Sequence, residues 1–393
     1  MNQNYPYPPQ RPSYPVQPPY AQGYPVQQAP VTPGDYQTPV QQPQGYGQPV
    51  YPQVPYAQPV QPYAVPQNYM PPAFAIGGTR PFRLTDASKS FNRMCLLLLL
   101  QMAAAFALEL PLMGLMMVAG IDILMDSIGF QLFAAALVPL TTALPFFIYL
   151  RVGHKETEQY LRFEKVGFGW GLMLVLAGVC CCILGNFPAF GVQEFFGNFG
   201  YESAGQFTNT DVSWPLVIIE LLSTAVLVPI MEEFAFRGVI FSALKKHGTG
   251  FAIVGSALIF AVAHLDFSTV VFALIAGLTM GYIYAKTRNL WVTVCIHAIN
   301  NGLAVLGNYA EFLFGDSGEF AAGMMMLIPI VVGGAAMLLL AIFRYREIFT
   351  PVPAKEGEPI PLRPSEAAGC IVRTPLFWVS LSFVVAYTAF LFF

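Results

Sequence analysis

The feature that most constrains this chain is a series of apolar runs, each long enough to cross a lipid bilayer. A helix needs about 20 apolar residues to span the hydrocarbon core of a membrane. Runs near this length occur at 94–119, 128–150, 169–190, 214–236, 269–285, 321–343 and 375–393. Of the 393 residues, 55% are hydrophobic and 10% are charged, whereas a soluble domain carries roughly 25% charged residues. The sequence therefore predicts an all-α, polytopic membrane helix bundle.

Two shorter apolar runs, 251–265 and 290–307, contain one histidine each and count as spans because of the charge distribution. When all nine runs cross and the N-terminus is cytoplasmic, every Lys and Arg lies in a cytoplasmic segment, and the charged residues of the outer loops are all acidic. Such asymmetry is the positive-inside pattern of membrane proteins. We therefore expect nine helices in an integral protein of the plasma membrane, with the N-terminus inside and the C-terminus outside.

The chain divides into four segments. Residues 1–75 are dominated by Pro, Gln and Tyr and lack the apolar content for a core, so we expect a disordered arm with polyproline II character. This arm is either a tether or a ligand for an SH3-like or WW-like partner. Residues 76–349 form the transmembrane core of eight helices, 350–374 a linker, and 375–393 an additional C-terminal helix. The six cysteines include no CxxC pair at metal-binding spacing.

Several ionisable side chains fall within the apolar runs, where a charge is costly and usually functional or paired. Counted along the helices from the basic ends, Glu232, His264, His297 and Asn301 lie roughly 14–21 Å deep, near the middle of a ~30 Å hydrocarbon core. We therefore expect three helices to bring polar side chains to one level. Glu109 and Glu220 also lie within spans, and we expect them to form hydrogen bonds between helices.

The spacing within the first of these helices separates two adjacent carboxylates. Glu233 and Arg237 are four residues apart and share one helix face, so Arg237 can neutralise and orient Glu233. Glu232 points about 100° away and is left to face another group. We expect Glu232 to be the reactive carboxylate of the pair.

The other two helices supply imidazoles and a carboxamide. Phe260 with His264, and His297 with Asn301, repeat the four-residue spacing. A carboxylate and an imidazole in a desolvated place can deprotonate a water, and a second imidazole with a carboxamide can donate hydrogen bonds to an oxyanion. Glu232, His264 and His297 could instead hold zinc. Because HExxH is absent and Asn is an uncommon zinc ligand, we favour a hydrolase without a cofactor and keep zinc as the alternative.

The ordered motifs EExxxR, FxxxH and HxxxN on successive membrane helices resemble the CPBP family. This family contains the CAAX prenyl proteases and the bacteriocin-processing enzymes, also called Abi proteins. The resemblance covers roughly 214–307, and loosely the core 94–349. It implies an intramembrane endopeptidase, glutamate-type or metal-dependent, that cleaves a membrane-embedded peptide or lipidated protein in the bilayer.

The same resemblance implies roles for individual residues. Glu232 would activate a water with the help of His264, and His297 with Asn301 would form the oxyanion site. The supporting residues that hold the motifs in shape would be Glu233, Arg237 and Phe260.

Two other functions fit the same sequence. A noncatalytic membrane scaffold, or a bacteriocin-immunity protein of the same fold, would recruit partners through the Pro-rich arm. A transporter would relay protons through its membrane carboxylates, but the sequence has no inverted repeat or paired broken helices that would favour it. We expect no nucleic-acid partner.

Overall fold

A computed structural model describes residues 80–120, 128–201, 212–350, 360–390 and 392, which belong to one compact unit, Met70–Phe393. This part of the chain consists of helices, and its only β-type pairing is an isolated bridge between Phe163 and Asn289. The all-α class predicted from the sequence is confirmed. The predicted disordered arm, 1–75, lies outside the described residues.

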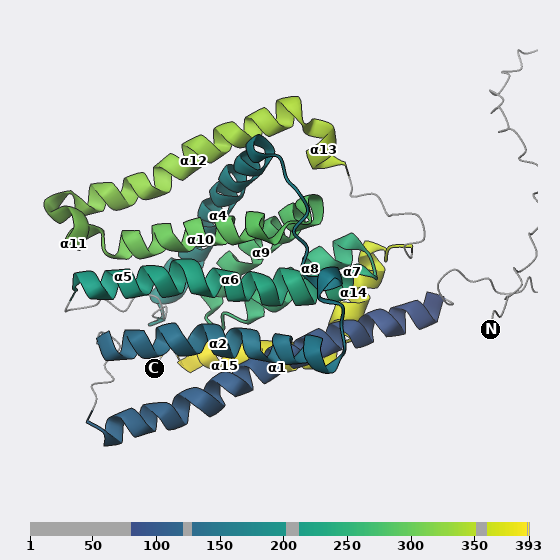
Figure 1. The fold of residues 1–393 in the computed structure, drawn as a ribbon, viewed down its shortest axis with the longest axis horizontal. Coiled ribbons are helices and arrows are strands. Elements are labelled where there is room, and N and C mark those ends of the chain that lie inside the picture. Colours follow the sequence, from purple (N-terminus) through teal and green to yellow (C-terminus); the bar gives the residue numbers. More distant parts are fainter. Residues whose placement is uncertain (1–79, 121–127, 202–211, 351–359, 391, 393) are drawn as a thin grey trace, which may run out of the picture. The chain divides into compact units, whose positions relative to one another are not determined.

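The helical elements are shown in Figure 1. They are α1 (Arg80–Val118), α2 (Ile128–Val152), α3 (Thr157–Tyr160), α4 (Phe168–Gly197), α5 (Trp214–Leu222), η2 (Ser223–Leu227), α6 (Val228–Glu233), η3 (Phe234–Phe241), α7 (Ser242–Lys245), α8 (Thr249–Val262), α9 (Phe267–Thr287), α10 (Leu290–Asn308), α11 (Ala310–Phe314), η4 (Gly315–Ser317), α12 (Gly318–Phe343), α13 (Tyr345–Phe349), α14 (Pro364–Val372) and α15 (Pro375–Phe390).

Seven helical segments in the described ranges are long and apolar enough to cross a membrane. They are Arg83–Val118, Ala135–Val152, Phe168–Gly197, Trp214–Lys245, Phe267–Thr287, Leu290–Asn308 and Ala310–Phe343. The predicted short span 290–307 is among them, as α10. The polytopic membrane bundle is therefore confirmed.

Two predicted spans differ from the structure in detail. The run 251–265 becomes α8, whose 14 residues rise only about 21 Å and end before His264. The last run becomes α15, which reaches spanning length only together with α14, from which it is bent by 68°. Helix α14 lies inside the predicted linker 350–374. Its start carries a sequence signal for a helix N-terminus: Pro364 occupies the first turn, and Glu366 accepts the Arg363 backbone N–H at 2.9 Å.

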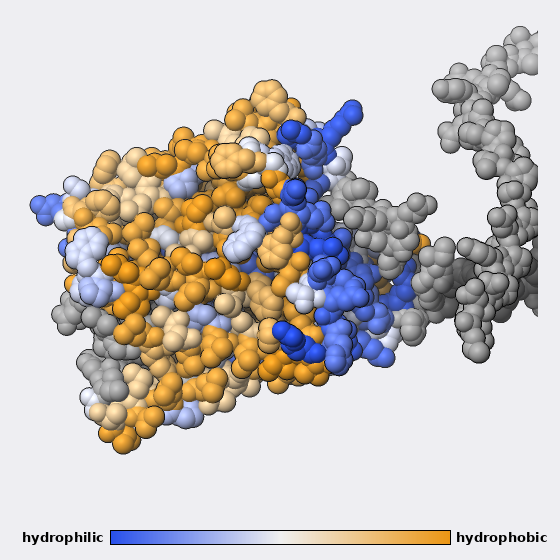
Figure 2. Space-filling view, in the orientation of Figure 1, coloured by the Kyte–Doolittle hydropathy of each residue, from blue (hydrophilic) through white to orange (hydrophobic). Residues whose placement is uncertain are grey.

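Apolar side chains cover most of the visible surface of the described unit, and polar side chains gather at one end (Figure 2). That end carries α7, α13 and α14 (Figure 1). Exposed Leu, Val, Ile and Phe residues on α1, α2, α4 and α12 suit contact with lipid, because lipid tails are as apolar as these side chains. The distribution expected from the sequence, with Lys and Arg confined to one end of the helices, agrees with this surface.

The helices approach one another most closely where glycine leaves room. A Cβ at Gly277 of α9 would lie 3.0 Å from the Cα of Ala257 on α8, and a Cβ at Gly333 of α12 would lie 2.4 Å from the backbone oxygen of Leu176 on α4. Small residues at such crossings let membrane helices pack by direct backbone contact. Helix α9 is held in this way between α8 and α4.

The span from Trp214 to Lys245 is interrupted by two π-helical segments, η2 and η3. Pro229 explains the first, because proline has no N–H and its ring clashes with the carbonyl four residues earlier, here that of Ala225 in η2. No comparable sequence signal marks the second. The widened turns flank α6, whose last two residues are Glu232 and Glu233.

Candidate functional site

A fully buried ion pair forms the base of the site. Arg237 Nη1 lies 2.6 Å from Glu233 Oε1, and the two side chains are 1% and 0% exposed. Arg237 also contacts the carbonyl oxygen of Gly277 on α9, at 3.5 Å. The pairing predicted from the four-residue spacing is confirmed, although it is built across π-helical turns.

His297 of α10 joins this pair from the neighbouring helix. Its Nδ1 lies 3.0 Å from the same Glu233 Oε1. A carboxylate paired with arginine only accepts hydrogen bonds. His297 Nδ1 therefore carries a hydrogen and donates a hydrogen bond to Glu233. The imidazole is thereby fixed in orientation, and its Nε2 is directed towards Glu232 Oε2, 3.7 Å away.

Glu232 is the more accessible carboxylate. Its side chain is 18% exposed, compared with none of Glu233, and its Oε2 is buried without a hydrogen-bond partner. The separation predicted for the two glutamates is therefore present: one is neutralised by Arg237, and the other faces an imidazole nitrogen at 3.7 Å. That imidazole belongs to His297. Within the described residues, no ion pair shorter than 4 Å joins Glu232 to His264.

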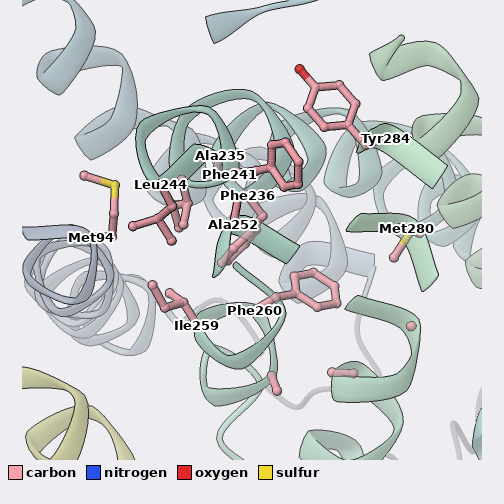
Figure 3. Packing of buried hydrophobic residues seen from close by; sticks show 14 of the residues in the cluster. Met94, Ala235, Phe236, Phe241, Leu244, Ala252, Ile259, Phe260, Met280 and Tyr284 are labelled. Atoms are coloured by element: carbon pink, nitrogen blue, oxygen red, sulfur yellow. The ribbon is translucent and has the colours of Figure 1, made fainter. Parts of the chain in front are cut away.

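Phe260 of α8 fills the space beneath these polar groups. Its ring lies 4.5 Å from the Arg237 guanidinium carbon and 5.9 Å from the His297 ring, and it meets Phe236 edge-on at 4.9 Å. Figure 3 shows Phe236 and Phe260 within the packed core. The aromatic ring holds the cation on one side and excludes water from the buried ion pair.

His264 lies in the turn that follows α8, beside the ring of Phe260 at 4.8 Å. Its Nδ1 donates to the carbonyl oxygen of Phe260, at 2.8 Å, which leaves Nε2 as an acceptor. The chain then turns through Leu265, whose φ is +60°, and buried Asp266. Tyr201 donates a hydrogen bond to the Asp266 carboxylate. His264 is thus placed at a helix end, half-buried, with one nitrogen unused.

Asn301 lies one turn beyond His297 on α10. Its Nδ2 donates to the carbonyl oxygen of Thr224 in η2 at 3.0 Å, and its Oδ1 accepts from Asn300 at 3.3 Å. This network fixes the amide orientation and leaves the second N–H of Nδ2 available. Thr224 was not expected from the sequence. Its carbonyl is free to accept because the π-helical turn before Pro229 disrupts regular helix bonding.

The structure brings Glu232, Glu233, Arg237, His297 and Phe260 into one cluster. The expected meeting of Glu232, His264 and Asn301 at one level stays a prediction, because α8 contributes Phe260, and not His264, to this cluster. His264 and Asn301 flank the cluster through Phe260 and Thr224 respectively. Glu220, outside the cluster, accepts from Tyr309, as expected for a hydrogen bond between helices. The side chain of Glu109 lies outside the described part of the chain.

A metal would need a different arrangement of these residues. Among the described residues, no group of three or more His, Cys, Asp or Glu side chains is placed to hold a metal ion. His264 is bonded to the Phe260 carbonyl oxygen, and no described contact joins it to Glu232 or His297, so the set of Glu232, His264 and His297 is not assembled as a three-ligand zinc site.

An apolar cavity of about 700 Å³ lies beside the site. Leu227, Ile230, Met231 and Phe234 line it from the helix that carries Glu232, and Val294 lines it from α10, one turn before His297. The remaining lining comes from apolar residues of α2, of the connection between α3 and α4, and of the start of α10. An apolar chain segment in this cavity would contact the helix that carries Glu232, but none of Glu232, Glu233 and His297 is among the described residues that line it.

Comparison with known proteins gives one family and two relatives. Residues 214–303 match the model of the family described as type II CAAX prenyl endopeptidase Rce1-like, so the resemblance inferred from the motifs is confirmed over this segment. The chain is 29% identical over 162 residues, 40% of its length, to the Bacillus subtilis "Putative membrane peptidase YdiL". It is 34% identical over 95 residues, 22% of its length, to the "Membrane-embedded CAAX protease MroQ" of Staphylococcus aureus.

These matches cover 64% of the first relative and 38% of the second. No solved structure matches the chain. The matched family segment contains all the site residues named above, from Thr224 to Asn301.

Proposed function

We propose that this protein is an intramembrane endopeptidase that hydrolyses a peptide bond of a membrane-associated peptide or protein, by CAAX-type or bacteriocin-type processing. The observation that carries the proposal is Glu232. It is a carboxylate without a hydrogen-bond partner at Oε2, 3.7 Å from an imidazole nitrogen that a buried Glu233–Arg237 pair orients. The apolar cavity against the helix that carries Glu232 supports a substrate that arrives within the membrane.

The proposed reaction uses a water bound to Glu232. The water would donate a hydrogen bond to Glu232 Oε2, which has no hydrogen-bond partner among the described residues. Glu232 takes a proton from this water as the oxygen attacks the scissile carbonyl carbon, and later returns that proton to the leaving amine. His264, with Nε2 as an acceptor, would assist in orienting the water.

The oxyanion would receive hydrogen bonds from His297 and Asn301. His297 Nε2 faces the site beside Glu232 and would donate when it carries a proton, and Asn301 has a second N–H to offer. Donors fixed before the reaction stabilise developing charge without reorganisation. Glu233 and Arg237 act as positioning residues, since they hold His297 and touch no reacting atom.

We further propose that the reaction needs no metal and that the protein lies in the plasma membrane with its N-terminus in the cytoplasm. The first proposal is checked by measuring zinc in purified protein and cleavage after chelation. Stoichiometric zinc, with activity lost on chelation, would favour the alternative set of Glu232, His264 and His297. The orientation is checked by labelling single cysteines introduced at the two ends of α12.

The decisive test compares peptides that accumulate in cells carrying Glu232→Gln with those in wild-type cells, by mass spectrometry. A general base contributes about 10²–10⁴-fold to rate, so we expect an uncut substrate to accumulate while the variant protein persists at normal levels. Glu220→Gln is the matched control, because Glu220 is a carboxylate of the same span that contacts Tyr309 outside the cluster. Unchanged processing in the Glu232 variant, with loss of phenotype only on deletion of 1–75, would favour a noncatalytic scaffold.

A further inference from the structure

A large basic cavity lies apart from the candidate active site, at the polar end of the described helices. Its volume is about 890 Å³. Six cationic side chains line it: Arg93, Lys155, Arg162, Lys245, Lys246 and Arg288. No acidic residue is among the described residues that line it. Lys246 pairs at 3.4 Å with Asp86, which is not among the described lining residues. The like charges of the cavity still repel one another, and a bound anion would relieve this repulsion.

Two of these arginines carry buried donors without partners. Arg162 Nε and Arg288 Nη1 are buried from solvent, and neither has a hydrogen-bond partner. A buried charged donor that is left unsatisfied costs free energy, which a bound anion would recover through charge-assisted hydrogen bonds. The unpartnered donors are a second observation, separate from the excess of positive charge, and both indicate an anionic ligand.

The backbone holds these two arginines in register. The N–H of Leu290 donates to the carbonyl oxygen of Arg162, and the N–H of Glu164 donates to that of Arg288, both at 3.0 Å. These bonds flank the isolated bridge between Phe163 and Asn289. Two separate loops are thereby fixed side by side, so their guanidinium groups need no large rearrangement to bind one anion.

A second cavity adds an apolar extension. It measures about 530 Å³ and lies between α1 and α2. It shares Arg93, Tyr149 and Lys155 with the basic cavity, and apolar residues such as Leu100 and Ala104 form most of the rest of its wall. A ligand that occupied both would have an anionic group joined to a long apolar chain.

We propose that this protein binds an anionic phospholipid, with the headgroup phosphate in the basic cavity and an acyl chain in the groove between α1 and α2. Basic pockets between membrane helices recognise such headgroups, and arginine matches the geometry of phosphate oxygens. The basic cavity also reaches Ser242 and Ala243, directly after the π-helical segment η3. A bound lipid would therefore contact the helix that carries Glu232.

The test measures lipid retention by the purified full-length protein, using native mass spectrometry in a non-ionic detergent. Phosphatidylglycerol is compared with phosphatidylcholine, and inorganic phosphate is tested separately as a competitor. We expect phosphatidylglycerol to be favoured about tenfold or more, and this preference to be lost in Arg162→Gln/Arg288→Gln, because each charge-assisted bond contributes about tenfold. The matched control is Lys89→Gln/Arg373→Gln, which removes two exposed charges outside the cavity and should change binding less than about twofold.

Further variants separate the sources of phosphate. Ala104→Trp fills the groove and should weaken lipid binding without affecting phosphate competition. Equal binding of free phosphate and lipid, unaffected by Ala104→Trp, would overturn the acyl part of the proposal. No preference for phosphatidylglycerol, or an equal loss in the control variant, would overturn the site itself. If the double arginine variant does not fold, Lys155→Gln at the junction of the two cavities gives the same readout.

Discussion

The two adjacent glutamates should respond in opposite ways to the same substitution. Glu233 is fully buried and lies 2.6 Å from Arg237, which is itself 1% exposed. Replacing Glu233 by Gln leaves the guanidinium charge buried without its counterion, and breaking such a pair from one side costs about 3–5 kcal/mol. Glu232, by contrast, is 18% exposed and has its imidazole neighbour 3.7 Å away, so Glu232→Gln should change stability little.

The assay is thermal unfolding of the purified variants in detergent, with cleavage of a substrate measured in parallel. At about 2–4 °C per kcal/mol, Glu233→Gln should lower the melting temperature by roughly 6–20 °C. Glu232→Gln should stay close to the wild type in melting temperature but lose about 10²–10⁴-fold in rate. Activity should fall in both variants, because Glu233 orients His297 through a 3.0 Å contact.

A double variant separates the lost ion pair from other effects of the substitution. Replacing a whole buried pair by apolar residues is often neutral, so Glu233→Leu/Arg237→Met should be more stable than Glu233→Gln alone, yet inactive. The reasoning is refuted if Glu232→Gln is destabilised as much as Glu233→Gln. It is also refuted if Glu233→Leu/Arg237→Met is less stable than Glu233→Gln.

Two further predictions concern the fold. Gly333→Ala should lower the melting temperature, because the new Cβ would lie 2.4 Å from a backbone oxygen of Leu176. Gly334→Ala is the control and should be neutral or slightly stabilising, because a Cβ there would have nothing within 4 Å. Equal melting temperatures of the two variants would contradict the close packing of α12 on α4. Burial, with the nearby charge of Lys246, lowers the pKa of His247 to about 4. Because the unfolded chain binds this proton near pH 6.5, stability is full above that pH and falls as the pH drops towards 4, by roughly 2 kcal/mol at pH 5. Melting curves should show this decline in the wild type and a weaker one in His247→Asn.

Much of the fold follows from local properties that a sequence displays directly. The long apolar runs predict membrane helices because backbone N–H and C=O groups must be hydrogen-bonded within the bilayer. A single segment can satisfy all of them only as a helix. The failures have local causes as well. Helix α8 is shorter than its apolar run because the chain leaves the helix before His264. Hydropathy does not predict helix α14, because its nine residues are fewer than a membrane-spanning window contains.

The site was predictable only in part. The pairing of Glu233 with Arg237 depends on one helix and follows from their spacing. The partner of Glu232 depends on how α6, α8 and α10 are rotated against one another, and the sequence contains no measure of that rotation. Two π-helical segments change the phase of side chains along the span, and only η2 has a visible cause, in Pro229. For these reasons the structure presents His297 to Glu232 and leaves His264 beside Phe260.

The sequence by itself determined that this is a membrane helix bundle, that its positive charges lie at one end, and that three successive helices carry the polar motifs. These features depend on composition and on spacing within single helices. The tertiary structure alone decided which imidazole faces the free carboxylate. It also decided that Arg162 and Arg288 meet in one basic cavity and that an apolar cavity forms against the helix that carries Glu232. Each of these depends on side chains distant in the sequence, whose distances are set by helix packing.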